Sequence, residues 1–465
     1  MFTAIFNNLI LNTDSYKASH FLQYPPHSEI VSSYIEARKN PQFSQVLFFG
    51  LQAFIKEYLL RPITREHIDE AEAIFLAHGE PFNRAGWEWI LEEHLGFLPL
   101  TISALPEGVV VPTGTALVQV HNADPHTYWL TSYLETALLR AVWYPSTVAT
   151  ISWQAKQIIK RYLEQTCDDP VNQLPFKLHD FGARGVSSQE TAALGGMAHL
   201  VNFKGTDTVA ALLAARRYYG AEMAAFSIPA AEHSTITAWG REHEAHAYAN
   251  MLRQFAKPGK VFAVVSDSYD IYNAVSVLWG EQLREQVLNS GATVVIRPDS
   301  GDPKTVVVEV LERLYAKFGG RMNQKGYKVL HDSVRVIQGD GVNLDSIGVI
   351  LAHIEQHGFS TENVAFGMGA GLLQKVNRDT LNFAMKTSAI RINNQWQDVY
   401  KQPITDPSKN SRRGRLAVIR QDNNWQTLRI EELGQAENQL RPVFRDGKLL
   451  IDDSFEQVRE RSMQF

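Results

Sequence analysis

The sequence predicts an α/β protein, with an irregular (β/α) barrel-like domain and a discontinuous, mostly β second domain formed by both termini. Three observations predict this class. Short apolar strands ending in polar residues recur from about residue 176 onward, and residues 180, 207 and 233 close three of them, 27 and 26 residues apart. These strands are almost continuously apolar, as in buried parallel sheets. Shorter strands separated by Pro and Gly fill both ends of the chain.

The first 165 residues alternate helix and strand signals. Residues 64–78 have the amphipathic pattern of a helix and end before Gly79, a common helix stop. Residues 97–120 predict short strands in an antiparallel or sandwich-like layer, because Pro and Gly separate brief apolar runs. Residues 127–165 predict a largely helical segment, with a break expected at Pro145 because proline clashes with the preceding turn.

Residues 166–379 are expected to form the barrel-like domain. Apolar runs such as 261–265 and 294–296 suit parallel strands covered on both faces. The interval between strand ends leaves room for a crossover helix each time. Polar residues at the carboxyl ends of these strands are expected to meet at one end of the barrel, where (β/α) barrels place their active sites.

The tail, residues 380–465, returns to short strands in segments such as 416–420 and 425–430. This pattern of short strands and turns matches that of residues 97–120. Residues 1–165 and 380–465 are therefore expected to build one discontinuous α+β domain around the barrel-like domain of 166–379.

The composition limits the class of protein. The chain has 465 residues, 45 Lys and Arg against 50 Asp and Glu, and a formal charge of −5, which argues against a nucleic-acid binder. Its one cysteine, Cys167, excludes an internal disulfide and a cysteine-ligated zinc cluster. The apolar start is short and lacks a basic leader, and no apolar run approaches the ~18 residues of a membrane helix. We expect a cytoplasmic protein without a membrane partner.

Two strand ends carry charged residues that suit phosphate chemistry. Arg297 and Asp299 follow Val-Val-Ile directly, where a core role is hard to explain. Arginine binds phosphate in a bidentate way, and carboxylates bind Mg²⁺ partly through water. Gly339 and Asp340 form a second strand-end turn, whose carboxylate can accept hydrogen bonds from a ribose. For this turn an ordinary Asp-Gly turn is the stronger alternative.

A glycine-rich turn follows the strand 364–366. Gly369, Ala370 and Gly371 precede a helical run, and backbone N–H groups at such a turn can point at an anion. A tight turn that merely needs glycine explains the pattern equally well. Arg378 is expected about two turns into the following helix, from where it can reach back towards a phosphate.

A histidine adds a reactive group to the same predicted rim. Glu232 and His233 end another strand, and His233 can serve as a base, a metal ligand or a nucleophile, or as a structural histidine. Phe181, after His179 and Asp180, adds an aromatic ring. Phosphate-binding arginines, acids for Mg²⁺ or hydroxyls, and a flat ring together predict a phosphosugar or nucleotide enzyme.

The residues also match a known family. The chain resembles the nicotinamide phosphoribosyltransferases, type II phosphoribosyltransferases, over almost its whole length. The matching stretches are DSYKASH (14–20), KLHDFGARGVSSQE (177–190), VNFKGTDT (201–208), PAAEHSTITAW (229–239), VSDSYDIYN (265–273), IRPDSG (296–301) and GLLQK (371–375). The resemblance implies a homodimer with active sites at the subunit interface. It also implies synthesis of nicotinamide mononucleotide from nicotinamide and 5-phosphoribosyl 1-pyrophosphate with Mg²⁺, coupled to ATP.

The resemblance further assigns roles to individual residues. Phe181 and the partner chain's Tyr16 would enclose the pyridine ring, and Asp207 would accept a hydrogen bond from the carboxamide. His233 would be phosphorylated by ATP, with Glu232 and Asp267 close by. Mg²⁺ would be held through the pyrophosphate, with Asp267 and Asp299 as candidate ligands. The ribose and phosphates would be held by Arg184, Arg297, Asp299, Gly339, Asp340, Gly369, Ala370, Gly371 and Arg378, and the pyrophosphate and ATP by Arg38, Lys386 and Lys401 of the partner chain.

Two positions depart from the animal members of this family. Ala370 replaces a glycine in the phosphate loop and would be strained at a positive φ, and Ala183 replaces a tyrosine beside the ring pocket. Three other functions compete with this one. They are a nicotinate phosphoribosyltransferase, which Asp207 disfavours; a non-catalytic nucleotide-binding protein on the same scaffold; and a Schiff-base aldolase using Lys204.

Overall fold

The computed structural model describes residues 8–406, 409–422 and 424–464. Contacts divide the chain into two compact units. Unit 1 comprises Met1–Thr150, Arg217–Ala221 and Asn377–Phe465, and unit 2 comprises Ile151–Arg216 and Glu222–Val376. The first boundary lies at residue 150 rather than at the expected 165, because the second half of helix α6 (Glu135–Thr166) bonds to unit 2 residues. Ser152 Oγ lies 2.9 Å from His199 Nδ1, and Thr166 Oγ1 lies 2.8 Å from Thr361 Oγ1.

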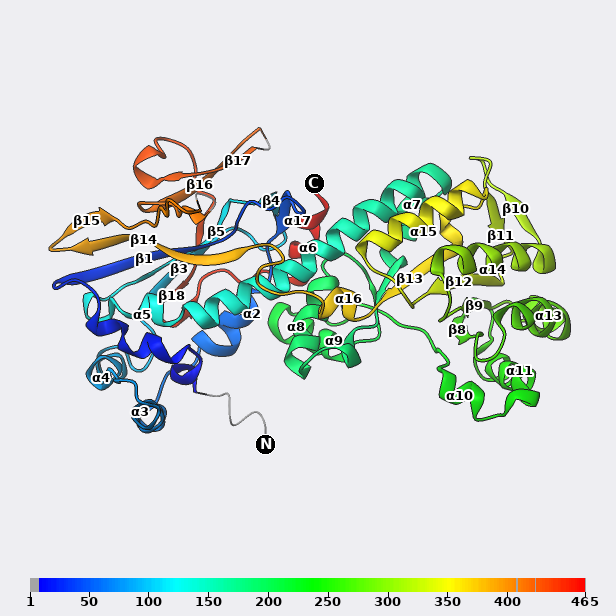
Figure 1. Ribbon diagram of the computed structural model, residues 1–465, viewed down its shortest axis with the longest axis horizontal. Helices are drawn as coiled ribbons and strands as arrows, with labels where there is room; N and C mark the ends of the chain where they lie inside the picture. Colours follow the sequence, from blue (N-terminus) through cyan, green and yellow to red (C-terminus); the bar gives the residue numbers. More distant parts are fainter. Residues whose placement is uncertain (1–7, 407–408, 423, 465) are drawn as a thin grey trace. The chain divides into compact units, whose positions relative to one another are not determined.

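Unit 2 is built on a six-stranded sheet in the order β7-β6-β13-β12-β9-β8 (Figure 1). Every neighbouring pair is parallel. The strands are β6 (Leu178–Asp180), β7 (Gly205–Thr206), β8 (Val261–Val265), β9 (Thr293–Arg297), β12 (Val334–Gln338) and β13 (Val364–Met368). Three of these strands are almost wholly buried, which explains why their sequences are continuously apolar.

A short segment closes the sheet into a ring. Phe226 pairs with Gly205 of β7, and Ala230 pairs with Ala263 of β8, both in parallel. Backbone hydrogen bonds therefore continue from one edge strand to the other. The inside of the ring is filled by Ala263, Val295 and Ile337, with Phe181, Ile228 and Ala365 packed against them. The prediction of a barrel-like α/β domain is confirmed.

Helices connect successive strands of unit 2 and lie around the sheet (Figure 1). Asp302 and Pro303 start the longest crossover helix of unit 2, α14, which buries Val306, Val310 and Leu314 on one face. The helices are α7 (Pro170–Gln173), α8 (Gln189–His199), α9 (Val209–Tyr219), α10 (His233–Thr237), α11 (Glu244–Phe255), α12 (Ile271–Asn273), the π-helix η8 (Ala274–Gln282), α13 (Arg284–Asn289), α14 (Pro303–Phe318), α15 (Leu344–Gln356) and α16 (Ala370–Leu373). A hairpin of β10 (Gly320–Met322) and β11 (Lys328–Leu330) follows α14.

Unit 1 contains a seven-stranded sheet in the order β15-β14-β1-β5-β3-β18-β19, whose pairs are antiparallel. Its strands are β1 (Ser28–Ala37), β3 (Leu100–Ala104), β5 (Ala116–Asn122), β14 (Phe383–Ile392), β15 (Gln395–Asp398), β18 (Arg441–Arg445) and β19 (Lys448–Leu449). Three strands from the N-terminal part of the chain, β1, β5 and β3, form its middle, with two C-terminal strands on each side. The prediction of a discontinuous, mostly β domain from both termini is confirmed.

Smaller elements complete unit 1. Strand pairs β2 (Gln45–Leu47) with β4 (Val110–Pro112), and β16 (Leu416–Gln421) with β17 (Asn424–Arg429), stand beside the main sheet. The helices are α2 (Leu51–Phe54), the π-helix η3 (Ile55–Leu59), α3 (Arg65–His78), α4 (Arg84–Glu93), α5 (Leu130–Tyr133) and α17 (Phe455–Met463). Helix α3 begins at the Thr64 cap and ends at Gly79 with φ 95°, as its sequence predicts. In the described part of the chain, no helix is long and apolar enough to cross a membrane.

The break expected at Pro145 is wrong, because α6 continues through it from Glu135 to Thr166. The proline ring packs against Gly50, where a Cβ would lie only 2.4 Å from Pro145 Cγ. Ser146 Oγ bonds to the backbone of Phe49 in both directions, at 3.0 and 3.1 Å. Packing and these hydrogen bonds compensate for the one backbone hydrogen bond that proline removes.

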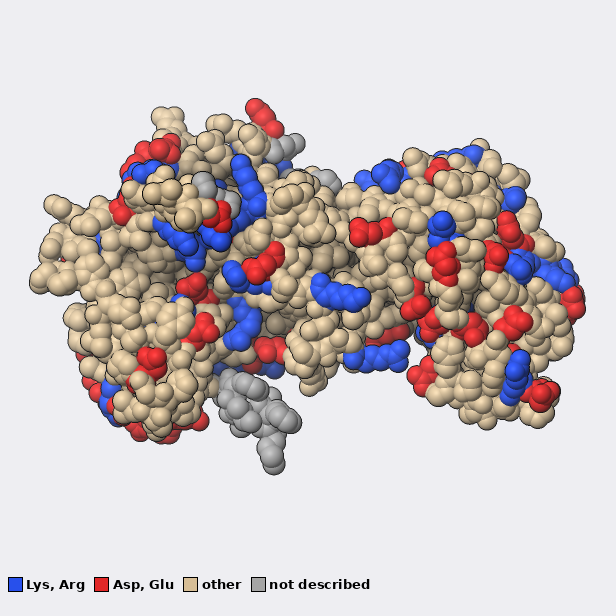
Figure 2. Space-filling model, viewed as in Figure 1, with Lys and Arg blue, Asp and Glu red and all other residues tan. Residues whose placement is uncertain are grey.

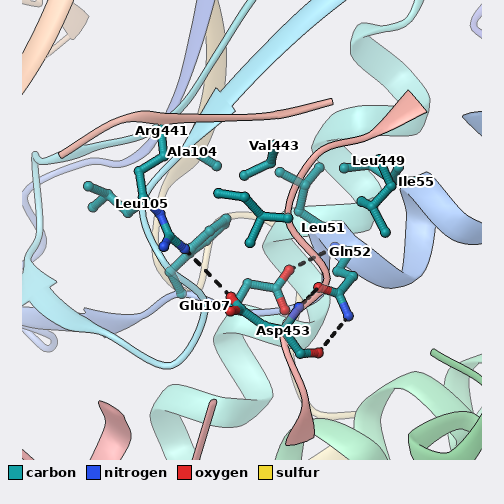
Figure 3. A pocket seen from close by; sticks show the side chains of 12 residues that line it. Leu51, Gln52, Ile55, Ala104, Leu105, Glu107, Arg441, Val443, Leu449 and Asp453 are labelled. Carbon is teal, nitrogen blue, oxygen red and sulfur yellow. Dashed lines mark hydrogen bonds and ion pairs between the residues drawn. The ribbon is translucent and has the colours of Figure 1, made fainter. Parts of the chain in front are cut away.

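Unit 1 also encloses a small cavity with a polar side (Figure 3). Glu107 is buried there and accepts hydrogen bonds from the Tyr219 hydroxyl at 2.5 Å and from the backbone N–H of Gln52 at 2.8 Å. Burial raises the pKa of this carboxyl. Figure 3 shows Gln52, Arg441 and Asp453 around the same space. Its volume of about 20 Å³ holds about one water molecule, so this cavity is too small for a substrate.

Candidate functional site

The predicted site residues of unit 2 lie at one end of its barrel. Because all the strands of the sheet run in parallel, their carboxyl ends lie at the same rim. Phe181 follows β6, Asp207 follows β7, and Asp267 follows β8. Arg297 ends β9 and Gly339 follows β12. The topology thus brings together residues far apart in the sequence.

His233 lies between two carboxylates. It is the first residue of α10, and its Nε2 lies 3.6 Å from Asp267 Oδ1 and 3.5 Å from Asp299 Oδ2. On the other side of the ring, Nδ1 lies 3.1 Å from Ser268 Oγ. These contacts orient the imidazole, and because it is 45% exposed it stays accessible from solvent. Glu232 caps α10 and bonds to Ser234 Oγ on that helix rather than to the imidazole.

Asp267 is the buried member of this cluster. Its Oδ2 accepts hydrogen bonds from Asp299 N at 2.8 Å and from Ser300 Oγ at 2.6 Å. Its Oδ1 is buried and has no hydrogen-bond partner in the structure. A buried carboxylate oxygen without a donor is costly unless a cation or a protonated group meets it. Sequence reasoning had not singled out Ser268 and Ser300, although the matching stretches 265–273 and 296–301 contain them.

The two carboxylates also suit a magnesium ion. Mg²⁺ keeps several waters and is usually held by one or two carboxylates plus substrate phosphates. Asp267 Oδ1 and Asp299 Oδ2 provide two such oxygens, at 3.6 and 3.5 Å from His233 Nε2. Among the residues that the structure describes, no group of three or more His, Cys, Asp or Glu side chains is arranged to hold a metal. Two carboxylate oxygens fit an ion that substrate phosphates also hold.

Arg297 places a cation beside these carboxylates. Its Nη2 lies 3.6 Å from Asp299 Oδ2, and the side chain is 19% exposed. The Nε–H of Arg297 is buried and has no hydrogen-bond partner. This guanidinium therefore has one N–H group free to donate a hydrogen bond to a further anionic oxygen.

Phe181 forms the floor of the rim. A Cβ on Gly367 would lie 1.9 Å from Phe181 Cε2, and one on Gly339 would lie 3.5 Å from the same atom. These two glycines therefore leave the space that the ring occupies. The backbone N–H of Phe181 donates to Met368 O at 3.0 Å, which fixes the ring beside β13. An aromatic ring held over a barrel end is a surface on which a flat heterocycle can stack.

Asp207 lies at the same rim and is exposed. Its backbone N–H donates to Asp180 O at 3.0 Å. Its Oδ1 accepts a hydrogen bond of 2.5 Å from Ser227 Oγ. Asp180 beneath it is buried, and burial raises the pKa of that carboxyl, which accepts from Gly182 N and Thr206 Oγ1. Sequence reasoning also missed Ser227, since nothing in the strand rhythm pairs residue 227 with residue 207.

The glycine-rich turn differs from expectation in two ways. Ala370 does not have a positive φ, so the strain expected there is absent. It begins α16, directly after Gly369. The helix ends at Leu373, so the prediction that Arg378 lies two turns along it is wrong. The guanidinium of Arg378 instead donates to Phe383 O and pairs with Asp379.

Other unit 2 residues named from the sequence either lie beside the predicted turns or are unreactive. Arg184 and Asp340 are exposed beside the turns in which the sequence places them, and Gly341 after Asp340 has φ +68°. Cys167 is buried, and burial raises the pKa of its thiol to about 12, which agrees with an unreactive residue.

The remaining site residues, like Arg378, belong to unit 1. Tyr16 is 56% exposed on the 3₁₀ helix η2 (Ser15–Leu22), and Arg38 follows β1. Lys386 lies on β14, opposite Tyr34 of β1. Burial lowers the pKa of Lys386, and the charges of Arg38, Lys401 and Lys17 lower it further while Glu135 opposes them. Arg38 and Lys401 thus each lie within electrostatic range of Lys386 in this unit.

Comparisons with known proteins agree with this site. The nicotinate phosphoribosyltransferase (NAPRTase) family matches residues 176–448, and the N-terminal domain of nicotinamide phosphoribosyltransferase matches residues 8–102. A nicotinamide phosphoribosyltransferase of Xanthomonas campestris pv. campestris (strain 8004) is 56% identical over 459 residues, covering 97% of both chains. One of Acinetobacter baylyi (strain ATCC 33305 / BD413 / ADP1) is 32% identical and covers 97% of this chain and 96% of the relative.

Solved structures of low sequence identity share the fold. A nicotinate-nucleotide pyrophosphorylase from Pyrococcus furiosus superposes with a TM-score of 0.66 at 16% identity, covering 99% of this chain and 96% of the other. Human nicotinic acid phosphoribosyltransferase superposes with a TM-score of 0.56 at 18% identity, covering 97% and 92%. From its matched family models and its relatives, the chain belongs to the nicotinate phosphoribosyltransferase family, in its nicotinamide phosphoribosyltransferase branch, and is a phosphoribosyltransferase.

Proposed function

We propose that the chain transfers the phosphoribosyl group of 5-phosphoribosyl 1-pyrophosphate to nicotinamide, giving nicotinamide mononucleotide and pyrophosphate in NAD salvage. One observation carries the proposal, namely the arrangement at the barrel rim. The Phe181 ring and the Asp207 carboxylate lie at this rim. Arg297 and the carboxylates close to His233 lie at the same rim. The 56% identity to a nicotinamide phosphoribosyltransferase supports the same reaction.

The chemistry needs positioning more than proton transfer. The pyridine nitrogen attacks the anomeric carbon with its own lone pair, so a C–N bond forms while the C–O bond to pyrophosphate breaks. No proton must leave the nucleophile, because the product is a pyridinium. The enzyme must hold the two reactants in line and neutralise the departing pyrophosphate. Phe181 would stack on the pyridine, and Arg297, Arg184 and Arg378 would bind phosphate oxygens.

The remaining polar residues of the rim would hold the sugar and the metal. Asp340 and the turns at Gly339, Gly369, Ala370 and Gly371 would contact the ribose and phosphates. Mg²⁺ would be held by the pyrophosphate with Asp267 and Asp299, whose oxygens flank His233. When bound, the ion supplies positive charge to the leaving group.

Asp207 would select nicotinamide over nicotinate. A carboxamide N–H₂ can donate a hydrogen bond to this carboxylate, whereas nicotinate presents a second carboxylate. Two such charges ~4 Å apart repel by about 4 kcal/mol at an effective dielectric constant of about 20, equivalent to roughly a thousandfold in binding.

His233 would couple the reaction to ATP. Asp267 and Asp299 favour a proton on Nε2, the nitrogen that faces them, which leaves the lone pair on Nδ1. An imidazole nitrogen would attack the γ-phosphorus of ATP, forming an N–P bond while the bond to the ADP oxygen breaks. Water would later cleave the N–P bond to give phosphate and free histidine. Glu232, at the cap of α10, would fix the start of the helix that carries His233.

The active unit would be a homodimer in the cytoplasm. The partner's Tyr16 would cover the pyridine, and Arg38, Lys386 and Lys401 of the partner subunit would meet the pyrophosphate and ATP. Two observations support an interface. Helix α9 exposes Val209 and Leu213, one turn apart, and the ring of Phe226 lies beside that of Phe176 with both exposed. Apolar groups exposed together are typical of an interface between chains.

A product assay tests the reaction. Purified protein is incubated with nicotinamide, 5-phosphoribosyl 1-pyrophosphate and Mg²⁺, with and without ATP, and the nucleotides are separated by chromatography. We expect nicotinamide mononucleotide and an equal amount of pyrophosphate. Protein that is folded by circular dichroism yet makes no mononucleotide under these conditions would refute the proposal and favour a non-catalytic nucleotide-binding protein.

A further inference from the structure

Ser227 lies on the short segment that closes the barrel ring, beside a residue that follows β7. Phe226 N donates to Lys204 O at 2.9 Å, and Thr206 N donates to Phe226 O at 3.2 Å. This register sets residue 227 next to Asp207. The Ser227 hydroxyl then donates to Asp207 Oδ1 at 2.5 Å, the short distance expected for a hydroxyl on a carboxylate.

The hydroxyl proton of Ser227 has one good acceptor. The only other acceptor that the structure gives Ser227 Oγ is Ile228 O at 3.5 Å, a much weaker contact. A serine hydroxyl has one proton and two lone pairs. Because the proton is committed to Asp207, Ser227 presents only lone pairs to anything else that approaches the pair.

Several hydrogen-bond donors around Asp207 bond to groups other than its carboxylate. The backbone N–H of Asp207 is taken by Asp180 O. Thr206 Oγ1 and Gly182 N donate hydrogen bonds to the Asp180 carboxyl, at 3.2 and 2.7 Å. His179 Nε2 lies 3.1 Å from Phe176 O. Burial lowers the pKa of His179, although the charge of Asp207 opposes this shift. A charged imidazolium is therefore disfavoured there. These four donors near Asp207 are therefore already used by other acceptors.

We propose that Ser227 is a specificity-determining positioning residue that acts through Asp207. Its hydroxyl holds the carboxylate in one orientation, with Oδ1 occupied and Oδ2 left for a ligand. Together the two side chains form a surface of acceptors only. A carboxamide N–H₂ finds partners there, whereas a carboxylate finds no donor and a fixed negative charge. This inference rests on the proposed function, since it concerns the same pocket.

Steady-state kinetics of Ser227→Ala test the role. We expect the KM for nicotinamide to rise about tenfold, the scale of one hydrogen bond to a charged group, with kcat changed by less than about threefold. The KM for 5-phosphoribosyl 1-pyrophosphate should stay as in the wild type. The kcat/KM ratio of nicotinamide to nicotinate should fall by about tenfold. Ser227→Thr, which keeps the hydroxyl, should restore both the KM and the ratio.

Two comparisons separate positioning from a general structural effect. Ser290→Ala removes a hydroxyl in the same unit that bonds to Val287 O, and it should change neither constant. In an Asp207→Asn background, Ser227→Ala should have much less further effect on the selectivity ratio, because both residues act on one contact. An unchanged ratio in Ser227→Ala, or equal losses for nicotinamide and nicotinate, would overturn the inference. Failure of the wild-type protein to make nicotinamide mononucleotide would instead refute the proposed function itself.

Discussion

Asp207 is the residue on which the choice of substrate depends in this account. Asp207→Asn removes the charge but keeps the size of the side chain. We expect kcat/KM for nicotinamide to fall by at least about tenfold, because the amide loses a charged acceptor. We expect kcat/KM for nicotinate to rise, because the repulsion of about 4 kcal/mol between two carboxylates disappears. Steady-state rates with each substrate measure both effects.

Asp180→Asn makes a useful comparison for this prediction, since Asp180 is buried beneath Asp207 and does not face the solvent. Its loss should reduce stability and both activities together. Selectivity that stays the same in Asp207→Asn would remove the argument that this carboxylate rejects nicotinate.

His233 carries a second prediction at the residue scale. His233→Ala should abolish ATP hydrolysis and the gain in rate that ATP provides, while ATP-independent synthesis should persist within about threefold. The reason is that the pyridine nitrogen needs no base for its attack. Parallel assays of phosphate release and of mononucleotide formation, with and without ATP, check this outcome. Equal loss of coupled and uncoupled synthesis would show that His233 takes part directly in phosphoribosyl transfer.

At the scale of elements, much of the fold could be predicted from sequence because its determinants are local. Helix α3 has its Thr64 cap and Gly79 stop within its own segment. Strands β8, β9 and β13 show their apolar runs in the sequence, and the parallel pairing of β8 with β9 brings Asp267 and Asp299 to neighbouring strand ends. The course of α6 through Pro145 could not be predicted, because it depends on Phe49 and Gly50, about a hundred residues earlier.

The candidate site shows the same limit. His233, Arg297 and Asp299 stand at strand ends and could be found from the sequence. Ser227 could not, because its role follows from the pairing of Phe226 with Gly205, which is an isolated bridge without a strand pattern. The place of Arg378 was missed because α16 stops after one turn.

Two neighbouring strands of unit 2 are joined by a buried lysine. Lys177 precedes β6, and its Nζ donates to Glu362 O at 2.6 Å, just before β13. Burial, together with the charge of Arg335, lowers the pKa of Lys177 from 10.5 to about 8, while Glu362 and Cys167 oppose the shift. The unfolded chain therefore binds more protons than the native state between pH 8 and 10.5. Stability rises with pH in this window and is lower below pH 8, where the native lysine is charged.

Lys177→Met removes this titration. From pH 7 to pH 9.5, the free energy of unfolding of the wild type should rise by about 2 kcal/mol relative to the variant. Urea unfolding of both proteins at the two pH values provides the measurement. Lys160→Met, at an exposed position of α6, should show no such pH-dependent difference. A difference between wild type and Lys177→Met that is constant with pH would contradict the lowered pKa.

At the scale of the whole molecule, the net charge of −5 conceals local concentrations of positive charge. In Figure 2, lysine and arginine side chains gather around the middle of unit 1, with acidic side chains between them. Arg38, Lys386 and Lys401 interact electrostatically within this unit. Such a small cationic group suits a polyphosphate rather than the long backbone of a nucleic acid.

Subunit mixing tests whether two chains share each site. Tyr16→Ala and Asp299→Ala should each be almost inactive as homodimers. Unfolded together in equal amounts and refolded, half of the dimers should be mixed, and each of these should contain one intact site. The mixture should therefore recover roughly a quarter of the wild-type activity. Sites built from a single chain would recover none, and that result would contradict the shared dimer.

The central claim is that this rim transfers phosphoribosyl to nicotinamide and rejects nicotinate. Direct competition measures it: the wild-type protein receives equal concentrations of both compounds with limiting 5-phosphoribosyl 1-pyrophosphate and Mg²⁺, and the two mononucleotides are quantified. We expect nicotinamide mononucleotide in at least a hundredfold excess, within the roughly thousandfold set by charge repulsion at Asp207. Equal amounts of the two products, or an excess of nicotinate mononucleotide, would contradict it.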